Sequence, residues 1–174
     1  MKALAIFLVA LLAAGSATAQ DLPNMSLTAG ESITVRFDDG GRVGSPVRSP
    51  AQWTPLDINA AIQLSGMTPQ VQTEGMPMHA PENVTRPQIP ADEVRLRMLS
   101  IDGRHTLFVV ENGQGRALAY RARMMVRGQR QPTDVCIVLP HLPSYEHWAF
   151  PIERLELSDF HFIPWAPGRA PTCE

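Results

Sequence analysis

Apolar and polar residues alternate through much of the second half of the chain, a pattern typical of β-strands that bury one face. In residues 116–127, apolar side chains occupy every even position from Leu118 to Val126, and arginines stand at three of the odd positions. A helix repeats about every 3.6 residues and could not place these two sets on opposite faces. The pattern therefore predicts a strand over residues 116–127 with one face in the core.

Turn residues interrupt this region at short intervals. Asp102-Gly103 and Asn112-Gly113 are pairs that tolerate the positive φ angles of tight β-hairpins. They predict a meander in which residues 94–101, 105–111 and 116–127 pair in succession. A further strand is predicted over residues 134–139, which is apolar on both sides, as a central strand of a sandwich would be.

Three other segments favour short strands, namely residues 31–37, 152–157 and 159–163. Short antiparallel strands with frequent turns, and no regular alternation with helices, favour two packed β-sheets. We therefore expect an all-β fold, an antiparallel immunoglobulin-like β-sandwich, formed as a single domain over residues 20–174.

A proline-rich insertion at about residues 44–91 breaks the strand pattern and holds half of the sixteen prolines. Within it, Thr54 can cap a helix that has Pro55 at its first position and Asp57 in its first turn. Gly66 can end that helix, so one short helix is predicted. The remainder is expected to be irregular, and long irregular segments inside compact domains are often functional.

The N-terminal residues have the pattern of a secretory signal peptide. Lys2 is followed by an apolar run over residues 3–14 and by Ala17-Thr18-Ala19, which suits a signal peptidase. The run is too short to cross a bilayer as a helix, since this takes about 20 residues. We expect a signal peptide over residues 1–19, cleavage after Ala19, no membrane span afterwards, and a location in the periplasm or outside the cell.

Cys136 and Cys173 are the only cysteines of the chain. Paired thiols close in the oxidising compartments that exported proteins reach, so a disulfide bond between them is expected. Their spacing is not the C-x-x-C of redox-active pairs, and the bond is therefore predicted to be structural.

Charge narrows the candidate partners. The formal net charge is −2 and Lys2 is the only lysine, so the chain has no general affinity for nucleic acid. Arg121, Arg123 and Arg127 fall on one face of the predicted strand, with Arg95 and Arg97 of a neighbouring strand as further candidates. An arginine row can bind phosphate or carboxylate groups of an envelope polymer or partner protein. The alternative is a solvated strand face that discourages aggregation.

Thioether and imidazole groups gather in the insertion. Met76, Met78 and His79 lie within four residues, and Met67 precedes them. Soft thioether and imidazole ligands suit Cu(I), so these residues could form a copper site. The alternative is that the methionines pack the insertion onto the sandwich.

Residues 140–148 are predicted to form a proline-broken loop that collects His141, Glu146 and His147. Such groups could serve as an acid–base site of a hydrolase or bind a hard metal ion. No established catalytic motif surrounds them, and the alternative is that the polar residues cap strand ends while aromatic residues close the sandwich.

Four short runs resemble a family of uncharacterised exported β-sandwich proteins of Gram-negative bacteria: Glu111-Asn112-Gly113, Tyr120-Arg121-Ala122, residues 133–140 and residues 145–148. The resemblance covers roughly the second half of the chain. It implies an exported β domain, and it implies no activity, cofactor or catalytic residue.

The leading hypothesis is a non-enzymatic periplasmic module without a cofactor, which binds or supports an unidentified envelope protein or polymer. It follows from the strand pattern together with the lack of a catalytic motif. Two alternatives remain: a periplasmic Cu(I) carrier that uses the methionine and histidine cluster, and a hydrolase with its site at the histidine and glutamate loop.

Overall fold

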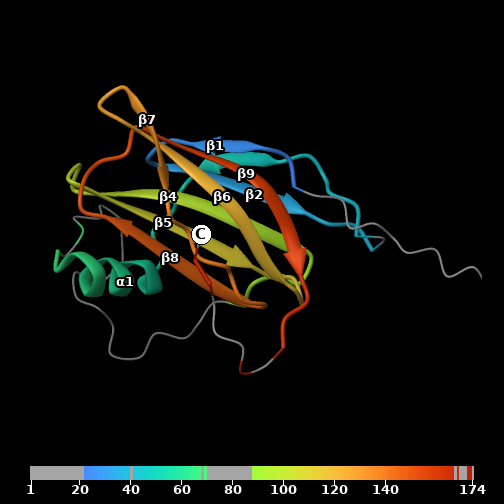
Figure 1. Cartoon of the computed structure of the whole chain (residues 1–174). Helices are drawn as coiled ribbons and strands as arrows, with labels where there is room; N and C mark the ends of the chain where they lie inside the picture. The colour runs from blue at the N-terminus through green and yellow to red at the C-terminus, as the bar shows by residue number, and fades with distance from the viewer. Residues whose placement is uncertain are drawn as a thin grey trace, which may run out of the picture.

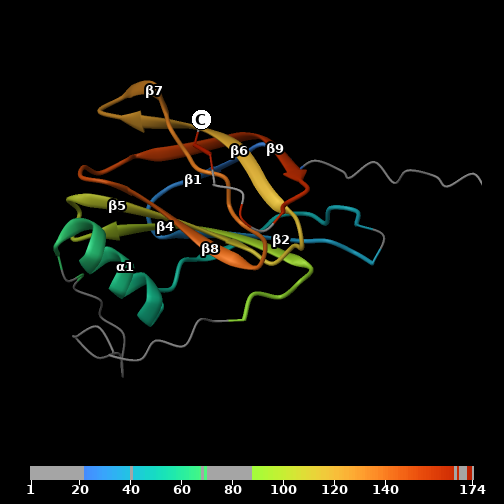
Figure 2. The same ribbon diagram turned by 60° about the horizontal axis from the view of Figure 1, so that its bottom comes forward.

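The computed structural model describes residues 22–39, 41–67, 69, 88–166, 168 and 172–173. Two antiparallel sheets pack face to face, and one helix covers the outer face of one of them (Figures 1 and 2). The predicted all-β sandwich is therefore confirmed, whereas its immunoglobulin-like arrangement stays a prediction. The signal peptide and most of the second half of the insertion lie outside the described residues.

The four-stranded sheet contains, in spatial order, β1 (Met25–Leu27), β9 (Arg154–Ile163), β6 (Ala117–Val126) and β7 (Gln129–Thr133). The five-stranded sheet contains β3 (Val47–Pro50), β2 (Glu31–Arg36), β4 (Glu93–Ile101), β5 (His105–Asn112) and β8 (Leu142–Trp148). The edge strands β7 and β8 carry Pro132 and Pro143, as expected where one side of the strand has no ladder to complete.

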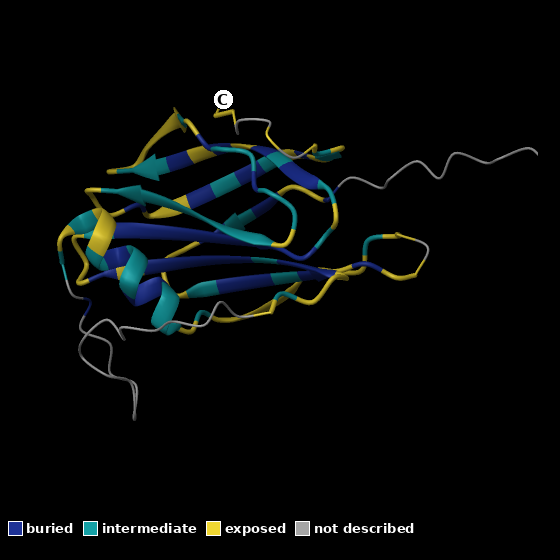
Figure 3. Ribbon diagram, turned by 90° about the horizontal axis from the view of Figure 1, so that it is seen from below, coloured by how far each residue is buried: buried dark blue, intermediate teal, exposed yellow. Residues whose placement is uncertain are grey.

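The core lies between the inner faces of the two sheets. Val94 and Phe108 reach it from the five-stranded sheet, and Leu118 and Leu155 from the four-stranded sheet, all without solvent exposure. Figure 3 shows the buried residues as dark blue bands along the strands. Burying each such side chain stabilises the fold by about 1.5–3 kcal/mol, so the alternating pattern of the sequence supplies the main driving force for this packing.

The predicted helix is confirmed as α1 (Pro55–Ser65). The Thr54 hydroxyl accepts a hydrogen bond from the Asp57 backbone N–H, and the Asp57 carboxylate accepts one from the Thr54 N–H. This reciprocal capping satisfies two backbone donors at the start of the helix. Gly66 ends the helix at a φ of 69°, where a residue with a side chain would be strained.

A second apolar cluster holds α1 on the outer face of the five-stranded sheet. Ala61 of the helix packs with Leu99 and Ile101 of β4 and with Leu107 and Val109 of β5. The helix therefore covers the outer face of this sheet at β4, β5 and β8, while the core lies on the inner face.

A network of buried ion pairs adds to this contact. Arg97 of β4 is 4% exposed, and its guanidinium forms ion pairs with Asp57 of α1 and, at 3.1 Å, with Glu111 of β5. Arg95 pairs with Glu93 and Glu111. The prediction that Arg95 and Arg97 join an exposed arginine row is thus wrong, because both lie in the five-stranded sheet, where Arg97 pairs with the helix and Arg95 with two carboxylates of that sheet.

The predicted meander is also wrong at its second turn. Asn112-Gly113 is not a hairpin, since β5 belongs to the five-stranded sheet and β6 to the four-stranded sheet. Asn112 is fully buried and donates hydrogen bonds to the carbonyls of Arg116 and Leu139. A Cβ atom on Gly113 would come within 1.8 Å of the Pro90 carbonyl oxygen, so glycine is needed where the chain crosses between the sheets.

Three further expectations need correction. Residues 134–139 form no regular strand and pair only through isolated bridges, Leu118 with Val138 and Cys136 with Cys173. The two strands predicted over residues 152–163 are one strand, β9, whose register against β6 shifts near Asp159. The predicted loop over residues 140–148 contains β8, which pairs with β5 along its whole length.

Candidate anion-binding face

Arginine side chains line the outer face of the four-stranded sheet. Arg121 and Arg123 occupy alternate positions of β6, so both point away from the core, as the sequence predicted. Arg130 joins them from β7, where it pairs with Met125 of β6. We call Arg121, Arg123 and Arg130 the arginine face. The sequence pattern missed Arg130 because it placed the hairpin return strand at residues 134–139 instead of 129–133.

Two acidic residues partly neutralise the arginine face. Arg130 lies 2.6 Å from the Glu156 carboxylate, and the Nε of Arg121 lies 3.9 Å from Asp159. Arg123 makes no ion pair with any residue that the structure describes. The side chains of Arg121 and Arg130 are 71% and 54% exposed, so their ion pairs contribute little to stability and the guanidinium groups stay accessible to another anion.

The surface around these arginines is hollowed in three places. A hollow of about 370 Å³ is lined by Arg123, Arg130, Glu156 and the serines Ser26 and Ser158. A second, of about 360 Å³, lies between Arg121 and Arg123. A third, of about 360 Å³, lies beside Arg121. Because neighbouring hollows share an arginine, they form a continuous row along β6 that an extended chain could follow.

Arg127, the third arginine of the predicted row, is not part of this face. It follows the end of β6 in the turn to β7 and has a φ of 50°. In this turn, the Arg127 side chain does not take the direction that a continued strand would give it. Arg127 instead lines a different hollow, beside Phe150. The period-two pattern applies only while the strand continues, so it could not place this residue.

The residues of the predicted hydrolase site are not brought together. Glu146 lies on the inner face of β8, where its carboxylate accepts a hydrogen bond from the Cys136 N–H at 3.0 Å and burial raises its pKa. His147, the next residue, lies on the outer face. His141 is exposed in the turn before β8. Neighbouring residues of a strand point to opposite faces, so β8 separates Glu146 from His147.

His147 instead pairs with His105 of β5, which no sequence motif singled out. The Nδ1 of His105 lies 2.9 Å from the Nε2 of His147, and the ring centroids are 5.1 Å apart. The separation of the centroids is close to the sum of the N···N distance and the two ring radii. The two nitrogens therefore lie nearly on the line between the ring centres and point at each other. This is the geometry of a hydrogen bond between the two rings, whereas a bound metal ion would need both lone pairs to point at a third position.

The histidine pair predicts a pH-dependent stability. Burial and the neighbouring His105 hold the pKa of His147 below its ordinary value of 6.5. The unfolded chain then binds this proton more readily, so stability present above about pH 6.5 is lost as the pH falls through the lowered pKa. Between about pH 8 and pH 5, the free energy of unfolding measured with urea should fall less in His147→Gln than in the wild type. An equal loss in variant and wild type would contradict this role.

The predicted copper site falls mostly outside the described residues, which do not include Met76, Met78 and His79. Met67 is described and packs against the second apolar cluster, beneath α1. For Met67, this contact agrees with the alternative that the methionines pack the insertion onto the sandwich. In the part of the chain that the structure describes, no group of three or more histidine, cysteine, aspartate or glutamate side chains could hold a metal ion.

Comparison with known proteins adds no further constraint. No protein-family model, no curated protein and no solved structure matches the chain. Among the described residues, no helix is long and apolar enough to cross a membrane.

Proposed function

We propose that this protein is a non-enzymatic binding module that docks an anionic polymer of the cell envelope on its arginine face. The observation that carries the proposal is the alignment of Arg121, Arg123 and Arg130 along one row of surface hollows. Successive outward positions of a strand lie about 7 Å apart, so neighbouring arginines can bind separate anionic groups of one extended chain.

Arginine suits this role because its planar guanidinium binds carboxylate and phosphate groups with two parallel hydrogen bonds. Ser26 also lines the first hollow, where its hydroxyl can donate a further hydrogen bond. The net charge of −2 argues against a general affinity for polyanions, so binding is expected to be confined to this face.

Two features support a location outside the cytoplasm. The N-terminal pattern predicts export to the periplasm or beyond, and the Cys136–Cys173 disulfide is the kind of bond that persists in such oxidising compartments. The hydrolase has less support, because β8 places Glu146 and His147 on opposite faces of its sheet. The copper carrier stays a second candidate, since Met76, Met78 and His79 lie outside the described residues.

Binding of a soluble polyanion tests the proposal. Polygalacturonate, a carboxylate polymer, is titrated into the protein and compared with neutral dextran, at about 20 mM and about 200 mM salt. We expect saturable binding of polygalacturonate that weakens with salt. Replacing two guanidinium groups in Arg121→Gln/Arg123→Gln should weaken it about 10-fold or more, since each charge-assisted hydrogen bond contributes about 1.5–3 kcal/mol.

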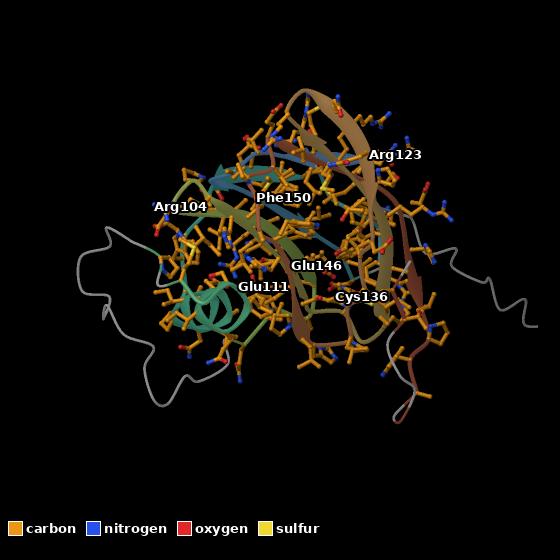
Figure 4. All side chains as sticks on the ribbon, turned by 60° about the vertical axis from the view of Figure 1, so that its left-hand side comes forward. Arg104, Glu111, Arg123, Cys136, Glu146 and Phe150 are labelled. Atoms are coloured by element: carbon orange, nitrogen blue, oxygen red, sulfur yellow. A yellow bond between two sulfur atoms is a disulfide. The ribbon has the colours of Figure 1, made fainter. Side chains whose placement is uncertain are left out.

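Arg104→Gln is the matched control. Arg104 is exposed in the turn between β4 and β5 and lies far from Arg123 in Figure 4. We expect this variant to bind polygalacturonate as the wild type does. Equal binding of dextran, or an equal loss in Arg104→Gln and the double variant, would show that the arginine face is not the binding site.

A further inference from the structure

A separate hollow opens at one end of the sandwich and takes no part in the arginine face. Its volume is about 700 Å³, within the range of small-molecule sites. It lies between the turn that joins β6 to β7 and the connection from β8 to β9. Its lining residues are Val126, Arg127, Gln129, Gln131, Phe150, Pro151, Ile152 and Glu153.

Hydrogen bonds to both sheets hold the β8–β9 connection in place. The Thr106 hydroxyl, buried in the five-stranded sheet, donates to the Phe150 carbonyl at 3.2 Å and accepts from the Ile152 N–H at 2.9 Å. On the other side, the Glu153 N–H donates to the Met125 carbonyl at 2.9 Å. The wall of the hollow is therefore formed in advance, and a ligand would not have to order it.

One side of the hollow is apolar and incompletely covered. Val126 and Pro151 contribute aliphatic surface, and Phe150 keeps 36% of its surface exposed, whereas Ile152 is buried in the core. Large hydrophobic residues with this exposure are few among the described residues, the others being Val47 and Leu64. Phe150 is therefore one of the few places on the described surface where an apolar ligand could gain burial.

The rim of the hollow carries one guanidinium and one carboxylate, and only the carboxylate has a described partner. The Arg127 guanidinium makes no ion pair or hydrogen bond with a residue that the structure describes. The nearby Glu153 carboxylate accepts hydrogen bonds from the Gly128 N–H at 3.1 Å and 3.4 Å, so it already has a donor, whereas Arg127 has no described acceptor. The amides of Gln129 and Gln131 are exposed and can donate further hydrogen bonds.

We propose that this hollow binds a single-chain amphipathic anion, with an aliphatic chain against Phe150 and Pro151 and a carboxylate or phosphate head at Arg127. The unpaired guanidinium beside an exposed apolar wall complements such a molecule at both of its ends. The proposal goes beyond the arginine face, because no residue that lines this hollow lines the three hollows of that face.

Calorimetric titration of the mature protein tests it with four probes below their micelle concentrations: dodecanoate, lauroyl-lysophosphatidylglycerol, neutral monolaurin and butanoate. We expect at least one of the two anionic probes, dodecanoate and the lysolipid, to bind. Which of them binds more tightly shows whether the natural ligand is a free fatty acid or a phospholipid. Monolaurin should bind about 10-fold more weakly, because it lacks the charge, and butanoate should not bind measurably.

Two variants of the rim and wall locate the site. Arg127→Gln should weaken dodecanoate binding about 10-fold, and Phe150→Ser should weaken it at least as much. Gln131→Trp, at an exposed position, fills the hollow and should abolish binding even if Phe150→Ser fails to fold. Arg121→Gln/Arg123→Gln should leave binding unchanged, which distinguishes this site from the arginine face.

Absence of binding by both anionic probes would overturn the proposal. So would wild-type affinity in Gln131→Trp, or an equal loss in Arg127→Gln and in the arginine-face variant. A failure of polygalacturonate to bind would leave this site unaffected, because the two experiments use different probes and different residues.

Discussion

Replacing Arg97 by methionine is expected to lower the free energy of unfolding by about 3–5 kcal/mol, the usual cost of breaking a buried ion pair. Asp57 has no solvent exposure and Glu111 is 4% exposed, so both carboxylates would lose a buried partner. Figure 4 shows Glu111 beside α1. Arg97 also donates a hydrogen bond to the Gln52 carbonyl at 2.8 Å, just before the helix, so α1 would lose its main polar contact with the sheet.

Urea denaturation measures this effect, with Arg121→Met as the matched control. Arg121 also projects from a strand face, but its side chain is 71% exposed, so the same substitution should change stability little. In Arg97→Met/Asp57→Asn the more deeply buried of the two carboxylates, Asp57, loses its charge, and part of the lost stability should be recovered. Similar losses in the two single variants would mean that the buried ion network does not dock the helix.

Replacing both cysteines by serine is expected to lower the free energy of unfolding by about 4 kcal/mol, because the unfolded chain then gains the freedom of an open loop. The bond between Cys136 and Cys173 closes a loop with a sequence separation of 37. The hydrogen bond from the Cys136 backbone N–H to Glu146 does not depend on the sulfur and should persist.

Reduction of the wild type provides the control for this variant. Cys173 is exposed, so a reductant can reach the bond, and reduced wild type should unfold at the same urea concentration as Cys136→Ser/Cys173→Ser. The variant itself should not respond to reductant. If the wild type did not respond either, the disulfide would contribute nothing to stability.

Local signals placed some elements within a residue or two. The helix α1 has its capping residues, Thr54 and Asp57, within one turn of each other, and Gly66 supplies its C-terminal cap. The hairpin at Asp102-Gly103 has both residues at positive φ, as predicted. These features depend on neighbours in sequence, and a single sequence contains those neighbours.

The pairing partners of the strands could not be predicted from such local signals. Residues 142–148 looked like a loop because Pro143 interrupts them, yet proline is tolerated in β8, which is an edge strand. The alternation of β6 was correct, but its sheet was not, because either sheet could bury Leu118 and Tyr120. Which edge a strand joins depends on the burial of the whole chain, and no local pattern encodes it.

The candidate site likewise has features that local sequence determines and features that only long-range contacts determine. The sequence by itself determined that Arg121 and Arg123 share an exposed face, that α1 exists, and that the two cysteines can pair, because periodicity, capping and composition are properties of nearby residues or of the chain as a whole. Only the tertiary structure decided that Arg130 joins this face, that Arg97 is buried beneath a helix, and that His105 meets His147. Each of these depends on strand order and register, which are set by contacts between residues far apart in sequence.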